Sequence, residues 1–201
     1  MSITDRINAF ARRMPTWLVY ALYLLPVPWL LYQAQTGGLG REPIKALEHE
    51  LGEIALQLLV IGLAITPLRR YLGLNLLKFR RAFGLLAFVY VTLHLLVWLV
   101  LDVGIISQIW ADIVKRPYIT IGMVAFGMMV PLAVTSNNWS VRKLGAGWRK
   151  LHKAVYVIAV LGVVHYIMVK KVWELEPLIY LAIVVALIAL RLPKRRRVQA
   201  V

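Results

Sequence analysis

The chain alternates between long apolar runs and short polar segments. A helix that spans a bilayer needs about 20 mostly apolar residues, and six runs fit this length: residues 16–35, 50–68, 82–102, 117–136, 152–170 and 176–193. No internal repeat and no long polar stretch interrupts the series. The pattern therefore predicts one all-α domain over residues 1–201, a polytopic membrane bundle of six transmembrane helices.

Prolines fall at positions that shape these runs. Pro26 and Pro28 lie within the first run and predict a bend, because proline removes a helical hydrogen bond. Pro117 opens the fourth run, where proline suits the first helical turn. The segment QTGGLGREP, which follows the first run, matches a signal-peptide cleavage site poorly. We therefore expect the first run to be a retained span.

Composition supports a membrane protein and narrows its chemistry. Hydrophobic residues make up 61% of the chain, whereas soluble domains contain about 45–50%. The formal net charge of +15 would suit nucleic acid, but the basic residues form short clusters between the runs, as in cytoplasmic loops of membrane proteins. We expect contact with lipid and none with nucleic acid. Cysteine is absent, which excludes disulfides, thiolate catalysis and iron–sulfur clusters.

The charges predict an orientation. With a cytoplasmic N-terminus, eighteen of the 24 basic residues lie on the inner side: Arg6, Arg12, Arg13, Arg69, Arg70, Lys78, Arg80, Arg81, Arg142, Lys143, Arg149, Lys150, Lys153, Arg191, Lys194, Arg195, Arg196 and Arg197. The outer side then holds Arg41, Lys45, Lys115, Arg116, Lys170 and Lys171, with every acidic residue except Asp5. Because basic residues favour the cytoplasmic side, both termini are predicted to be cytoplasmic.

Two histidines lie inside apolar runs, where a polar side chain is costly and suggests a function. His94 and His165 each lie 13 residues along a run directed outward, so both are roughly 20 Å from the inner side at about 1.5 Å per residue. Two imidazoles at one depth can ligate the two axial positions of a haem iron. Ala87 and Gly162 are small neighbours on these runs that would leave room for a macrocycle. The alternative is that each histidine only bonds a neighbouring helix.

His152 belongs to a separate group at the inner side. It stands in GWRKLHKAVY, and 13 residues turn a helix by roughly 220°, so His152 and His165 do not align on an ideal helix. It could ligate a second haem with an unusual partner or contact a quinone or flavin. Nearby cations could hold haem propionates or a phosphate, and these are Arg80, Arg81, Arg149 and Lys150. The alternative is an ordinary basic loop.

His49 begins a polar stripe on the outer half of the second run. His49, Glu53 and Gln57 follow one another at intervals of four residues, which places them on one helix face. The stripe could line a path for quinone or protons, or it could be a hydrated helix end. Two residues of ligand type do not make a zinc site. Nor does the sequence show a nucleophile–base triad, a phosphate loop or a dinucleotide fingerprint.

Five segments together resemble the MsrQ (YedZ) family of the ferric-reductase-like transmembrane superfamily. They are GGLGREPIKALEHELGEIAL, LAITPLRR, FRRAFGLLAFVYVTLHLLVW, RPYITIGMVAF and LAVTSNNWSVRKLGAGWRKLHKAVYVIAVLGVVHYI, in the family's order over about residues 20–192. The loops match as well as the apolar runs, which makes the resemblance specific.

The resemblance implies a function that the residues alone do not give. Members are multi-pass proteins of the bacterial inner membrane that bind haem b. They pass electrons from the respiratory quinone pool to a periplasmic molybdenum-containing methionine sulfoxide reductase, which repairs oxidised periplasmic proteins. The family's haem histidines correspond to His94, His152 and His165, so one or two haems are implied. FMN is also attributed to the family, although this sequence contains no flavin motif.

Two other functions remain open at this stage. A proton-coupled transporter could use His49, Glu53 and the histidines within the runs, but transporters usually show repeats or helices broken near the midplane, and neither is evident. A ferric or cupric reductase of the same superfamily would usually need a nucleotide-binding flavoprotein domain, which the sequence does not contain. We expect a b-type haem electron-transfer subunit.

Overall fold

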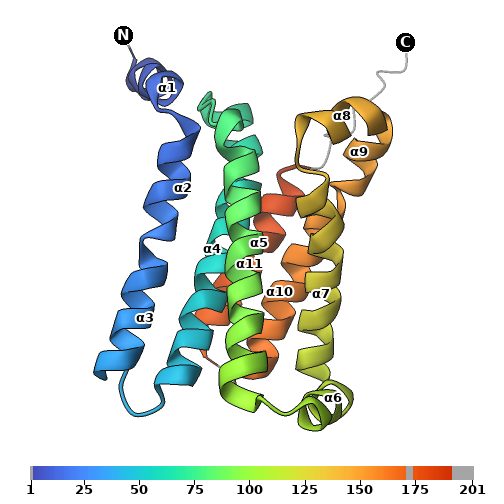
Figure 1. Ribbon diagram of the computed structural model, residues 1–201. Coiled ribbons are helices and arrows are strands. Elements are labelled where there is room, and N and C mark those ends of the chain that lie inside the picture. Colours follow the sequence, from blue (N-terminus) through green and yellow to red (C-terminus); the bar gives the residue numbers. More distant parts are fainter. Residues whose placement is uncertain (1, 171–173, 192–201) are drawn as a thin grey trace.

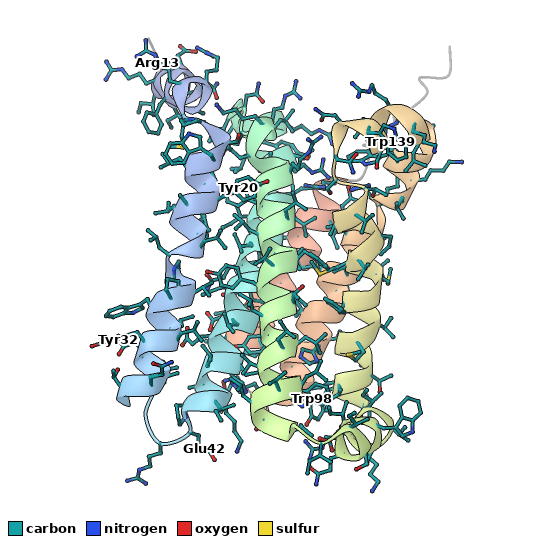
Figure 2. All side chains as sticks on the ribbon, in the orientation of Figure 1. Arg13, Tyr20, Tyr32, Glu42, Trp98 and Trp139 are labelled. Atoms are coloured by element: carbon teal, nitrogen blue, oxygen red, sulfur yellow. The ribbon has the colours of Figure 1, made fainter. Side chains whose placement is uncertain are left out.

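The structure is a computed structural model that describes residues 2–170 and 174–191, and within these ranges it contains helices and no strands. Figure 1 shows an upright bundle with the short helices α1, on one side, and α8 and α9, on the other side, at one end, and with α6 at the opposite end. We call these the α1 end and the α6 end. Figure 2 places Arg13 and Trp139 at the α1 end, and Glu42 and Trp98 at the α6 end.

The helices follow one another through short connections. Their bounds are α1 Ile3–Arg13, α2 Thr16–Leu24, α3 Pro26–Thr36, α4 Pro43–Leu72, η1 Leu77–Phe79, α5 Arg80–Leu96, η2 Val97–Val103, α6 Ile106–Lys115, α7 Pro117–Val134, α8 Asn138–Leu144, α9 Ala146–Leu151, α10 Ala154–Val169 and α11 Leu175–Ala189. The prediction of an all-helical bundle is confirmed for the part of the chain that the structure describes.

Five of these helical stretches are long and apolar enough to cross a membrane. They are Thr16–Thr36, Pro43–Leu72, Leu77–Val103, Pro117–Val134 and Ala146–Val169, and α11 is a shorter apolar helix. The sixth expected span ends at residue 193, beyond the described range, as do Lys194 to Arg197, and Lys171 falls in the gap after residue 170. The chain is therefore a multi-pass membrane protein, while the sixth span and the cytoplasmic termini stay predictions.

Pro26 and Pro117 are each the first residue of a helix. Pro26 separates α2 from α3, and Leu25 between them keeps helical angles (φ −57°, ψ −38°), so the first span is one bent rod. Pro117 is the first residue of α7. Gly37 ends α3 with a φ of +82°, a conformation that residues with a Cβ atom rarely adopt.

The long helix α4 packs against α3, α5, α10 and α11. One of its backbone carbonyl groups accepts a hydrogen bond from an arginine side chain outside the helix. Pro67 lies inside α4 and has no N–H, so the Leu63 carbonyl loses its ordinary helical donor. Arg191, which follows α11, donates from Nε to that carbonyl at 3.1 Å. It also donates to the Tyr156 hydroxyl of α10 at 3.0 Å. One guanidinium thus joins three helices beside the proline.

Helix α1 is held to the bundle by polar contacts. The Asn8 side chain donates to the Gly73 carbonyl at 3.0 Å and accepts from the Asn75 N–H at 2.8 Å. Lys78 donates to the Arg12 carbonyl at 2.9 Å. The apolar face of α1 is not covered by the bundle, because the side chains of Ile3 and Phe10 are exposed. This amphipathic helix suits the membrane interface.

Candidate functional site

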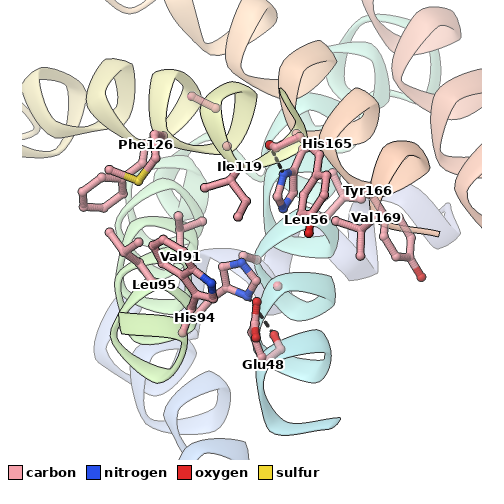
Figure 3. Close-up of a pocket in the computed structure, with 18 of the residues that line it drawn as sticks. Glu48, Leu56, Val91, His94, Leu95, Ile119, Phe126, His165, Tyr166 and Val169 are labelled. Atoms are coloured by element: carbon pink, nitrogen blue, oxygen red, sulfur yellow. Dashed lines mark hydrogen bonds between the residues drawn. The ribbon is translucent and has the colours of Figure 1, made fainter. Parts of the chain in front are cut away.

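Four helices line a cavity of about 280 Å³ that runs from the α6 end into the bundle. Residues of α4, α5, α7 and α10 line it, together with Trp98 and Asp102 of η2. Both His94 and His165 are among the lining residues. Figure 3 shows their rings directed into the same space from two different helices. The structure thus brings together the two imidazoles that stand out in the apolar runs of the sequence.

The two rings have a spacing that suits a shared metal ion. Their centres are 6.2 Å apart and their planes make an angle of 87°. A metal–imidazole bond of about 2.0 Å, with ~1.1 Å from a ring nitrogen to the ring centre, separates two rings on opposite sides of one metal by about 6 Å. The observed separation thus leaves room for a metal ion between His94 and His165.

A backbone carbonyl fixes the proton of each imidazole. His94 Nδ1 lies 2.8 Å from the Glu48 carbonyl oxygen, and His165 Nδ1 lies 2.7 Å from the Tyr118 carbonyl oxygen, as the dashed lines in Figure 3 mark. A carbonyl only accepts, so each Nδ1 must carry the hydrogen, and the lone pair belongs to Nε2. This orientation is typical of metal-ligating histidines. The alternative role, a bond to a neighbouring helix, uses only Nδ1 and leaves Nε2 for a ligand.

Two glycines that the sequence analysis missed make this approach possible. A Cβ atom on Gly52 would lie 3.1 Å from His94 Nδ1, and one on Gly122 would lie 3.0 Å from His165 Nδ1. Gly52 follows Glu48 by four residues, and Gly122 follows Tyr118 by four, so the same arrangement occurs on α4 and on α7. Each ring lies over the glycine and reaches the carbonyl one turn earlier.

The two small residues that the sequence analysis expected beside the histidines, Ala87 and Gly162, differ in their position relative to the cavity. Gly162 lines the cavity. Ala87 is not among the lining residues; it is fully buried in the core around α5, so the structure does not place it at the cavity where it was expected. The sequence offers a usable signal for Gly52 and Gly122, since each is a glycine inside an apolar run at the depth of a histidine. Which histidine each one faces depends on how the helices pack.

The turn after His94 is wider than an α-helix. Residues Val97–Val103 form a π-helix that ends at Gly104 with a φ of +65°. Trp98 and Asp102 of this segment reach the cavity. Widened turns of this kind often occur at functional sites, and no pattern in the sequence indicates this one.

His152 does not join the pair. It lies at the α1 end of the bundle, just before α10. Its ring stacks on Trp148 with centres 3.8 Å apart, and its Nδ1 lies 3.1 Å from the Trp148 carbonyl. Its Nε2 is 3.5 Å from the Ser136 hydroxyl. The four cations expected to act with it, Arg80, Arg81, Arg149 and Lys150, are exposed and lie outside the cavity lining, and Arg81 donates to Asn138 at 2.8 Å.

The polar stripe of α4 touches the cavity from the side. His49 and Glu53 line it, whereas Gln57 does not. Gln57 donates to the Glu53 carboxylate at 2.9 Å, and the Tyr180 hydroxyl of α11 lies 3.5 Å from the same oxygen. Glu53 is therefore placed between the cavity and α11, and Tyr180 is a partner that the sequence did not reveal.

The number of donors indicates which kind of metal group fits. Across the described ranges, no group of three or more His, Asp or Glu side chains could hold a bare metal ion. Two opposed imidazoles alone suit a metal that arrives with its other donors, as a haem iron does when a histidine occupies an axial position. The residues present thus fit a haem held by His94 and His165.

Fold and site together define a class of protein, a multi-pass helical membrane protein with two facing imidazoles in its bundle. Residues 51–163, more than half of the chain, match the family described as "Ferric reductase like transmembrane component". No solved structure matches the chain.

Similar proteins identify the family of the chain more narrowly. It is 50% identical over 177 residues to a protein of Brucella anthropi, with 88% of this chain and 80% of the relative covered. It is 49% identical over 179 residues to proteins of Brucella ovis and Brucella canis, with 89% of this chain and 81% of each relative covered. All three are named "Protein-methionine-sulfoxide reductase heme-binding subunit MsrQ". The chain belongs to the MsrQ family of heme-binding subunits.

Proposed function

We propose that this chain is a b-type haem electron-transfer subunit that carries electrons from the quinone pool to a periplasmic methionine sulfoxide reductase. The observation that carries the proposal is the pair of imidazoles with ring centres 6.2 Å apart. The names of the relatives support both the haem and the reductase partner. The quinone donor, the molybdenum of the partner, the bacterial inner membrane and FMN rest on the family resemblance.

In this proposal the chain's own residues hold and tune the iron. His94 and His165 would each offer Nε2 to the iron, and the carbonyls of Glu48 and Tyr118 keep the hydrogens on Nδ1. Such bonds raise the basicity of the ligands. A haem iron supplies one-electron redox chemistry. Apolar side chains around it, such as Leu56 and Phe126, exclude water from the site.

The position of the cavity supports electron exit at the α6 end. Its lining reaches Lys45, Asp102 and Arg116, which lie in or beside the connections at that end. The partner would dock on segments near residues 37–45, 102–116 and 170–176, of which residues 171–173 lie outside the described ranges. In this proposal the α6 end faces the periplasm.

An absorption spectrum tests the haem. Purified protein should give a low-spin b-type spectrum that sharpens on reduction with dithionite. Replacing His94 or His165 with Ala should abolish the bis-imidazole signature, because each removes one axial ligand. His49→Ala serves as the matched control, since His49 lines the same cavity but is not one of the facing pair. A wild-type reduced spectrum in both ligand variants would reject the pair as the haem site, whereas the absence of any haem spectrum in the wild-type protein would favour the transporter alternative.

Electron direction needs oriented membranes. In proteoliposomes with the α6 end outward, the reductase partner and a sulfoxide added outside should reoxidise the reduced haem. Reoxidation that requires the partner on the inside would contradict the proposed path. A quinol should reduce the haem without any other protein, and failure of that reaction would reject the quinone pool as donor.

A further inference from the structure

The cavity lining changes from charged to apolar along the bundle. On α4, Lys45 and Glu48 come first, and Leu56 and Leu59 follow toward the α1 end. At the start of α7, Arg116 (just before the helix) and Tyr118 come first, and Phe126 and Met129 follow. Both helices start at the α6 end. The charged part of the cavity is therefore at the α6 end on both sides, and we call it the mouth.

A haem has a matching asymmetry. Its two propionate carboxylates lie on one edge of the ring, and the opposite edge carries only hydrocarbon groups. Burying a carboxylate among apolar side chains is costly, whereas hydrogen bonds to a guanidinium or an ammonium favour it. The side chains of Leu59, Met129 and Ile158 at the deep end suit the hydrocarbon edge.

We infer that Arg116 and Lys45 at the mouth form a binding site for the haem propionates, so that the charged edge of the ring faces the α6 end. The inference rests on the proposed haem between His94 and His165. It assigns the propionates of this haem to cations other than those that the sequence suggested. Arg80, Arg81, Arg149 and Lys150 do not line the cavity.

The present contacts of the two cations leave them available. Arg116 pairs with Asp112 at 3.2 Å, and Lys45 pairs with Glu42 at 2.9 Å; the four side chains range from 19% to 68% exposed. Ion pairs of this exposed kind contribute little, so exchange of an acidic partner for a propionate costs little. Arg116 also donates to the Tyr118 hydroxyl at 3.4 Å, which links it to the residue whose carbonyl orients His165.

Two acidic residues at the mouth should weaken the binding of a propionate there, which adds an effect of opposite sign to the test. Glu48 and Asp102 also line the mouth, and like charges repel a propionate. Removal of an acid and removal of a cation should therefore change haem binding in opposite directions. A site that merely fills space would not show this difference in sign.

The experiment compares haem with haem dimethyl ester, which lacks both charges. Full-length apoprotein in detergent is titrated with each, and the ratio of the two dissociation constants is measured. Wild type should bind haem roughly five- to tenfold more tightly than the ester. In the double variant Arg116→Gln, Lys45→Gln the ratio should fall close to one. Arg142→Gln, the matched control on α8 at the α1 end, does not touch the cavity lining and should keep the wild-type ratio.

The reduction potential gives a second readout. Loss of the two cations should lower the potential of the haem, while Asp102→Asn should raise it, because nearby positive charge favours the reduced iron. Equal ratios for wild type and the double variant, with a normal bis-imidazole spectrum, would overturn the inference and leave the haem proposal intact. An apoprotein that binds neither haem nor ester would overturn the proposed function itself. Arg116→Lys, Lys45→Arg keeps both charges and should retain the wild-type ratio.

Discussion

At the scale of single residues, glycine decides how closely a ring can approach a helix. Gly122 has the His165 ring against it, whereas Gly127 on the same helix α7 has no atom within 4 Å of the position of an added Cβ. These two positions differ in surroundings but share a helix and a residue type. They form a natural pair for testing the imidazole geometry.

We predict that Gly122→Ala weakens haem binding roughly tenfold or more, because crowding of this kind costs about 1–3 kcal/mol. Gly127→Ala should leave binding unchanged and slightly stabilise α7 through its helix propensity. Haem titration and electron paramagnetic resonance of the oxidised protein measure both effects. Equal behaviour of the two variants would show that the ring does not depend on Gly122.

His152 gives a second prediction at this scale. His152→Ala should cause partial haem loss or impaired electron input while the bis-imidazole signal of the other pair remains, because His152 lies at the opposite end of α10. Trp148→Leu, which removes the ring stacked on His152, is the companion variant. Loss of all low-spin signal in His152→Ala would show that the two regions are not independent.

The sequence reveals the histidines but not what surrounds them. An imidazole in an apolar run is visible because it breaks a pattern, and equal depth follows from counting residues along two runs. Gly52, Gly122 and the two carbonyls depend on the rotation and register of neighbouring helices, which apolar runs do not encode. Ala87 shows the limit, because it lies close to the His94 face on an ideal helix yet packs into the core.

At the scale of helices, Pro67 and Arg191 act as a unit. The proline frees the Leu63 carbonyl and the guanidinium binds it, so the cost of losing Arg191 should depend on the proline. Hydrogen bonds from charged groups contribute about 1.5–3 kcal/mol. This coupling can be measured because both side chains can be changed separately.

We predict that Arg191→Gln lowers the free energy of unfolding by about 2 kcal/mol. In a Pro67→Ala background the loss should be smaller, because an alanine at this position restores an N–H for the Leu63 carbonyl. Unfolding in detergent of the four proteins of this double-mutant cycle gives the coupling. Additive effects would mean that Arg191 acts through its bonds to Tyr156 and to the Gly62 carbonyl rather than through the carbonyl that Pro67 frees.

Helices that span the bilayer are easier to predict than those that lie beside it. The expected run 50–68 falls within α4, which is longer at both ends because Pro43 opens it and Gly73 ends it. Helices α1, α6, α8 and α9 were not predicted, because a search for apolar runs overlooks short helices with one polar face. Ser2 and Asp5 form a capping box at the start of α1, a local signal that could have indicated that helix.

At the scale of the whole molecule, charge separates the two ends of the bundle. We predict that a reporter active only in the periplasm is inactive when fused after Ala200 and active when inserted at Gln108 in α6, because basic residues favour the cytoplasmic side. Activity after Ala200 would reverse the orientation. It would also place the mouth of the cavity on the wrong side for a periplasmic partner.

Docking at the α6 end should depend only moderately on salt. The connections there hold both signs of charge, with Arg41 and Lys115 near Glu42 and Asp112. Raising ionic strength from about 0.01 to 0.1 M shortens the Debye length from about 30 to 10 Å. The rate of haem reoxidation by the reductase partner should then fall by only a few fold, as stopped-flow absorbance would show. A fall of a hundredfold or more would indicate a surface dominated by one sign.

The two imidazoles proposed as haem ligands lie on different helices, and this determines the order in which they are synthesised. His94 belongs to α5 and His165 to α10, and at about 5–20 residues per second roughly 4–14 s separate their synthesis. During that interval the nascent chain offers only one of the two facing imidazoles, and α7, whose Tyr118 carbonyl orients the second, is made within the same interval. If His94 and His165 hold the haem as proposed, its capture is therefore a late event, completed only after α10 has joined the bundle.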